Sequence, residues 1–167
     1  MSSSRPTSPL RIRWKKGRDG VHAFTCVRAD GSHSLQHHRT DFFAVHDLTH
    51  YAVETILGCE RGFYGLIAEG WNLDDFGQPW PRGPMPDEAL LPEVIVGLLD
   101  VAQASGVVIS AAELNESMRS WFARQQDTAP PLTLTEEQLA AIRSRTGELL
   151  SRWRALPAGE TLELTFP

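Results

Sequence analysis

The two ends of the chain share an alternation of apolar and polar residues that limits the folds available to it. Residues 10–15 read Leu-Arg-Ile-Arg-Trp-Lys, and residues 161–166 read Thr-Leu-Glu-Leu-Thr-Phe. A period of two is typical of a strand with one buried face. Because a lone strand is unstable, we expect the last segment to pair with the first in one antiparallel sheet.

Two further strands are expected next to the first one. Residues 21–28 predict a second strand, and Asp30-Gly31 predicts a two-residue hairpin turn, since glycine accepts the positive φ of a type I′ turn. This turn would place Arg28 opposite His33 and Phe24 opposite His37. In that register His37 points to the same side as the apolar face of the hairpin.

The middle of the chain predicts about five helices. Helical periodicity covers residues 41–57, 62–71 and 87–104, and Asp41 is expected to cap the first of these helices. The segments Ser110–Glu113 and Thr135–Gln138 have the spacing of capping boxes, which open two more helices. We therefore predict an α+β fold. A small antiparallel β-sheet, formed by an N-terminal three-strand meander plus a C-terminal strand, packs against about five helices.

The length of 167 residues predicts a single α+β domain over residues 10–167. Residues 1–9 are rich in Ser and Pro, lack the apolar core of a signal peptide, and are expected to form a disordered tail. The longest apolar run, around residues 94–99, is far shorter than the roughly 18 residues of a membrane span. We expect a soluble, cytoplasmic protein with Cys26 and Cys59 reduced.

The net charge of the chain limits the classes of binding partner that we expect. A formal net charge of -5 argues against nucleic acid, whose binding proteins usually carry a basic face. The partners expected are a small-molecule or peptide substrate, with neither nucleic acid nor membrane, and the sequence does not indicate an oligomeric state.

The segment His46-Asp47-Leu48-Thr49-His50 carries the strongest chemical signal. Histidines four residues apart share one face of a helix, which is a spacing that binds zinc in many enzymes. On a helical wheel both histidines fall within the apolar arc, so both rings should be turned away from bulk water. A buried imidazole needs partners for its nitrogens, and a metal ion would satisfy both rings at once.

The third ligand is expected to be Glu69, which lies on the next predicted helix, or alternatively His37 on the hairpin. A histidine-rich helix followed by a helix with a glutamate resembles the gluzincin metallopeptidases. This resemblance implies a zinc site formed by His46, His50 and Glu69. The chain departs from the gluzincin pattern at Asp47, where those enzymes have the glutamate that acts as general base.

Two functions follow from these residues. The first is a metal-dependent hydrolase with a zinc-class ion, in which metal-bound water is the nucleophile and Asp47 or Glu54 accepts its proton. The second is a non-enzymatic binding or regulatory module, in which His46 and His50 form a structural hydrogen-bonded network with carboxylates such as Glu69 or Glu54.

Overall fold

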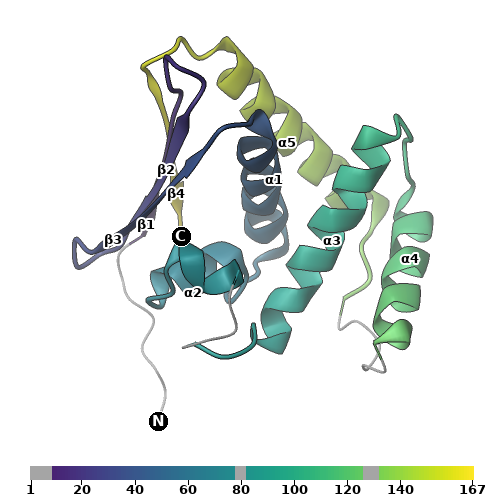
Figure 1. Cartoon of the computed structure of the whole chain (residues 1–167). Helices are drawn as coiled ribbons and strands as arrows, with labels where there is room; N and C mark the ends of the chain where they lie inside the picture. Colours follow the sequence, from purple (N-terminus) through teal and green to yellow (C-terminus); the bar gives the residue numbers. More distant parts are fainter. Residues whose placement is uncertain (1–8, 78–81, 126–131) are drawn as a thin grey trace.

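A computed structural model describes residues 9–77, 82–125 and 132–167, and in these residues a four-stranded antiparallel sheet is covered by helices (Figure 1). The predicted α+β fold is confirmed. The strands, in the spatial order β3-β2-β1-β4, are β1 (Leu10–Lys15), β2 (His22–Val27), β3 (His33–His38) and β4 (Thr161–Phe166). The helices are α1 (Asp41–Leu57), α2 (Phe63–Ala68), the short 3-10 helix η1 (Leu73–Gly77), α3 (Asp87–Ala104), α4 (Ala111–Arg124) and α5 (Glu136–Ala155). Residues 1–8 of the predicted tail lie outside the described residues.

The last strand closes the sheet as the alternation predicts. β4 pairs antiparallel with β1, and Leu10 lies opposite Phe166 at one end of the ladder while Lys15 lies opposite Thr161 at the other. In both strands the apolar residues are buried and most of the polar residues between them are exposed. The two ends of the chain therefore share one buried face of the sheet.

The turn between β2 and β3 is longer by one residue than the predicted turn. The amide of Arg28 donates to the carbonyl of Ser32 at 2.8 Å, and the amide of Gly31 donates to the carbonyl of Arg28 at 3.0 Å. Three residues, the last being Gly31 with a φ of +83°, therefore lie in the loop, whereas a type I′ turn would leave two.

This extra residue makes the predicted register of the hairpin wrong. Phe24 lies opposite Gln36 instead of His37, and His37 lies opposite Ala23. Because successive side chains of a strand point to opposite faces, a slip of one residue exchanges the faces. His37 and Leu35 are accordingly exposed, while Ser34 is buried.

The start of α1 also differs from the prediction. The N-cap residue is Thr40, and no side chain caps the helix. The carboxylate of Asp41 instead accepts a hydrogen bond from Nε1 of Trp153 at 2.9 Å and lies 3.2 Å from Nε2 of His22. Asp41 therefore connects α1 to α5 and to β2.

The other helix signals have mixed outcomes. The two predicted capping boxes are both present, at the starts of α4 and α5. α2 is shorter than the predicted span of residues 62–71, because Gly70 has a φ of +115°, which leaves the helical region. Within the described parts of the chain, none of the helices combines the length and apolar character needed to cross a membrane.

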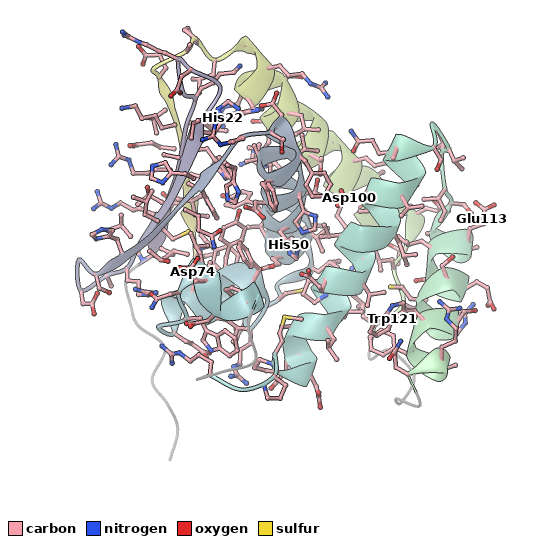
Figure 2. All side chains as sticks on the ribbon, in the orientation of Figure 1. His22, His50, Asp74, Asp100, Glu113 and Trp121 are labelled. Atoms are coloured by element: carbon pink, nitrogen blue, oxygen red, sulfur yellow. The ribbon has the colours of Figure 1, made fainter. Side chains whose placement is uncertain are left out.

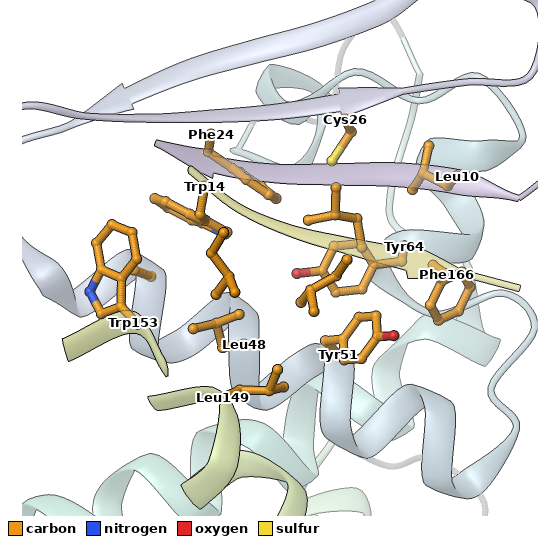
Figure 3. Packing of buried hydrophobic residues seen from close by; sticks show 14 of the residues in the cluster. Leu10, Trp14, Phe24, Cys26, Leu48, Tyr51, Tyr64, Leu149, Trp153 and Phe166 are labelled. Carbon is orange, nitrogen blue, oxygen red and sulfur yellow. The ribbon is translucent and has the colours of Figure 1, made fainter. Parts of the chain in front are cut away.

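Two hydrophobic cores lie on opposite sides of α1. The first joins the sheet to α1, α2 and α5 (Figure 3), and within it Trp14 stacks on Phe24 at 4.4 Å and meets the edge of Trp153 at 5.9 Å. The second joins α3 and α4 to Val53 of α1 and to the first half of α5. The molecule thus has three layers, with α1 and α5 between the sheet and the pair α3 and α4 (Figure 1).

The pairing of β4 should contribute strongly to stability. Phe166 is 3% exposed and its ring lies 5.5 Å from that of Tyr64 and 6.5 Å from that of Tyr51. We expect Phe166→Ala to lower the free energy of unfolding by about 3–5 kcal/mol, because it leaves a cavity in the first core. Glu163→Ala on the outer face, which removes only an exposed ion pair with Arg13, should cost less than about 1 kcal/mol. Urea denaturation compares the two, and equal losses would contradict this account.

Candidate metal centre

His46 and His50 meet at the interface of α1 and α3, together with Glu93 of α3. One ligand atom from each of these three side chains lies within 4.8 Å of the others. The two imidazole rings are 4.9 Å apart between centroids. Figure 2 labels His50 on α1, which lies beside α3, and Asp100 toward the C-terminal end of α3. The prediction that both histidines share one environment is confirmed.

The two helices supply the site in an antiparallel arrangement. Nδ1 of His46 lies 2.6 Å from Oδ2 of Asp100, and Nε2 of His50 lies 2.8 Å from Oε2 of Glu93. His50, the later of the two histidines in the sequence, thus pairs with Glu93, the earlier of the two acids, as antiparallel helices require. Glu93 and Asp100 are seven residues apart, which is close to two turns, so both acids lie on the face of α3 that packs against α1.

Each histidine has a carboxylate partner at its Nδ1 atom. Asp100 occupies this position in His46, and Glu54 occupies it in His50 at a distance of 3.0 Å. A carboxylate on one ring nitrogen fixes the orientation of the ring and makes the other nitrogen more basic. Nε2 is therefore the ring nitrogen that each histidine could offer to a metal ion, and in His50 this atom pairs with Glu93 at 2.8 Å.

Glu54 is itself held firmly. Its carboxylate is buried and accepts hydrogen bonds from the backbone amides of Phe63 at 2.8 Å and Tyr64 at 3.0 Å, which open α2. A Cβ atom on Gly62 would lie 2.5 Å from the carboxylate carbon of Glu54. The close approach of this carboxylate to the start of α2 therefore requires glycine at position 62.

The charges of the site are strongly coupled. Burial of the His50 ring disfavours its protonation, but the hydrogen bonds to Glu54 and Glu93 outweigh burial and raise the pKa of His50 to about 10. Burial acts to raise the pKa of Glu93, but its hydrogen bond to His50 prevails and lowers that pKa. The raised pKa favours the imidazolium form of His50 between these two carboxyl groups. A metal ion at Nε2 would take the place of its proton.

Acidic groups outnumber the histidines at this interface. Burial raises the pKa of Asp47 to about 7, although His50 and His46 act in the opposite direction. Burial likewise raises the pKa of Glu54. With Glu93 and Asp100, four carboxyl groups surround two imidazoles. A cation bound at this interface would favour the charged forms of these carboxyl groups.

The candidate site is partly exposed to solvent. The side chain of Glu93 is 43% exposed and that of His46 is 23% exposed. Gly97 lies between Glu93 and Asp100 on the same face of α3, and a Cβ atom there would meet nothing within 4 Å. The rings of Phe42 and Phe63 border the histidines at 5.8 and 5.3 Å. Glu93 and His46 are therefore the partly exposed members of the cluster, whereas His50 is buried.

Two of the residues predicted as ligands lie elsewhere. Glu69 follows α2, and its carboxylate pairs with Arg61 at 3.1 Å, with its side chain 41% exposed. Arg61 also pairs with Glu88, so Glu69 belongs to an exposed ion network. His37 is exposed on β3, as a result of the corrected register.

Sequence reasoning missed Glu93 as a ligand and Asp100 as a supporting acid. One signal was available in the sequence. These two acids are seven residues apart on a helix whose intervening residues are almost all apolar, in the segment Val-Ile-Val-Gly-Leu-Leu. Carboxylates at a spacing of two turns mark one polar line on such a helix. The residues that this line faces depend on how the helices pack.

The chain shows no significant match to a known protein family, to a curated protein or to a solved structure. The function is therefore inferred from the geometry of the site.

The hydrogen bonds that hold the Glu54 carboxylate against the start of α2 can be tested through Gly62. We expect Gly62→Ala to lower the free energy of unfolding by about 1–3 kcal/mol, because the added methyl group forces the buried carboxylate away from its amide donors. The matched control is Gly147→Ala, which adds a methyl group to the interior of α5 where nothing lies within 4 Å. This control should stabilise the protein by up to about 1 kcal/mol. Denaturant titration measures the free energy of unfolding of both variants. A change of the same sign in both would contradict this account of the Glu54 contacts.

Proposed function

We propose that the protein binds one divalent cation of the zinc class through His46, His50 and Glu93. The observation that supports this proposal most directly is the convergence of the three ligand atoms within 4.8 Å. It is strengthened by the carboxylates at Nδ1 of both rings. Ligand atoms of a tetrahedral zinc site are roughly 3.3 Å apart, so modest side-chain rotations would complete the site.

The donor set favours zinc over the harder cations. Two imidazole nitrogens and one carboxylate oxygen suit Zn²⁺, whereas Mg²⁺ and Ca²⁺ prefer sites made of oxygen ligands. Three protein ligands leave a fourth position for water, which is the pattern of catalytic zinc sites. The exposed side of Glu93 and the space beside Gly97 are in keeping with an open position.

From this site we infer hydrolysis of a small-molecule or peptide substrate. A zinc-class ion lowers the pKa of bound water to about 7 and polarises the bond under attack. Glu54 accepts hydrogen bonds from two amides and from His50, which suits it to positioning the His50 ring. The assignment of Asp47 or Glu54 as proton acceptor stays a prediction from the sequence.

One observation favours a function without metal. Both ring nitrogens of His50 already have carboxylate partners, Glu54 and Glu93. A histidine satisfied in this way can serve as a structural element of a binding or regulatory module. The two functions differ in whether a stoichiometric ion is present.

Metal binding is tested with apo protein loaded with Zn²⁺ or Co²⁺. We expect one ion per chain by elemental analysis, and a cobalt absorption spectrum typical of nitrogen and oxygen ligands. Glu93→Gln should weaken affinity by at least the roughly 10–100-fold that loss of a supporting carboxylate costs, as measured by competition with a chelator. His46→Ala should weaken it at least as much.

The matched control is Glu69→Gln, because Glu69 was the ligand predicted from the sequence and lies in the exposed pair with Arg61. This variant should keep the affinity of the original protein. The absence of a stoichiometric ion would favour the metal-free module. An equal loss for Glu69→Gln and Glu93→Gln would refute the assigned ligand set.

Hydrolysis is tested separately with zinc-loaded protein on a panel of nitrophenyl carboxylate esters, phosphate esters and short peptides. We expect turnover of at least one class, lost on chelation and restored by Zn²⁺. Asp47→Asn should lower kcat while metal content stays at one ion per chain, whereas Glu69→Gln should change neither. A fully loaded protein without turnover on any class would leave the metal with a structural role and sink the hydrolase proposal.

A further inference from the structure

A pocket lies away from the ligand atoms, where α3 and α5 meet the chain that connects α3 to α4. Its volume is about 400 Å³, which is within the range of roughly 300–1,000 Å³ typical of small-molecule sites. Apolar side chains from several segments form much of its wall, among them Leu99, Val107, Ile142 and Leu150. We refer to it as the α3–α5 pocket. None of its lining residues is a proposed metal ligand.

The space in this pocket depends on a glycine inside a helix. Gly147 lies in the interior of α5 and lines the pocket. Glycine at such a position destabilises a helix relative to alanine. A Cβ atom on Gly147 would meet nothing within 4 Å, so no close packing partner requires glycine there. Its effect is to leave the pocket open on the α5 side.

The polar groups of the pocket favour an anion. Arg143 and Arg154 are its charged lining residues, and no carboxylate lines it. Arg143 donates to the backbone carbonyl of Ile109, which holds the connecting segment against α5. In the described part of the chain, no acidic side chain forms an ion pair with Arg154. A cationic lining in a chain of net charge -5 is a local exception.

A buried hydroxyl adds an unsatisfied polar atom. Thr146 is one of the lining residues, but its Oγ1 atom is shielded from solvent and has no hydrogen-bond partner among the described residues. Such groups usually have a partner, which can be protein, ordered water or ligand. Rotation of this side chain toward the pocket would let water or a polar ligand supply one.

From these features we infer that the α3–α5 pocket binds a small amphipathic anion, namely a carboxylate with a medium-length alkyl body. The alkyl body lies against Leu99, Ile142 and Leu150, and the carboxylate pairs with the guanidinium of Arg154. Apolar burial supplies affinity and the charged pair fixes orientation.

The probe is sodium octanoate, titrated into the full chain by calorimetry, with 1-octanol and acetate as controls for the two ends of the ligand. We expect saturable binding of one octanoate per chain and weaker binding of both controls. Arg154→Ala should weaken octanoate binding about tenfold or more, because it removes a charged hydrogen-bond donor. It should leave octanol binding unchanged.

The need for empty volume in the α3–α5 pocket is tested by placing larger side chains in it. Gly147→Leu should abolish octanoate binding, while the matched variant Gly147→Ala should retain it. Ala102→Leu fills the pocket from α3 and serves if Gly147→Leu does not fold. Zinc content should stay the same in all these variants, so failure here is distinct from failure of the metal site. No octanoate binding, retained binding when the pocket is filled, or no effect of Arg154→Ala would each overturn the inference.

Discussion

A buried carboxylate must be surrounded by donors, and the arrangement of the helices depends on how Glu54 meets this requirement. Two amides at the start of α2 and Nδ1 of His50 satisfy its oxygens. Removing such partners leaves an uncompensated group in the interior, which is far more costly than leaving an exposed one. The same contacts set the position of α2 against α1 and the direction of the His50 ring. Glu54 thus links the position of α2 to the geometry of the candidate site.

The elements that depend on local chemistry were predictable from the sequence. The alternation in β1 and β4, the capping boxes, and the facing of His46 and His50 each follow from the periodicity of a strand or helix. Each of these patterns is formed by residues that are close in sequence to the strand or helix that they determine. The pairing of β4 with β1 was also predictable, because an apolar strand face has few alternatives to joining an existing sheet.

The features that were not predicted from the sequence depend on the exact length of a loop or on how the helices pack. One residue in the loop at Gly31 reversed the faces of β3 and moved His37 to the exposed side. Glu69 belonged to the helix next in sequence, but Arg61 provided it with a nearer partner. Glu93 reaches the histidines only because α3 packs antiparallel to α1. Periodicity identifies the buried face of a helix but not the neighbour that covers it.

The antiparallel pairing of α1 and α3 also fixes how far one helix can slide along the other. His46 and His50 are separated by about 6 Å along α1, whereas Asp100 and Glu93 are separated by about 10.5 Å along α3. The two acids therefore bracket the histidines from outside, and each reaches inward to its ring. A slide of α3 that shortens one contact must lengthen the other. Together the two contacts oppose sliding of α3 along α1 in either direction and so favour one register of the two helices. Neither contact involves the sheet.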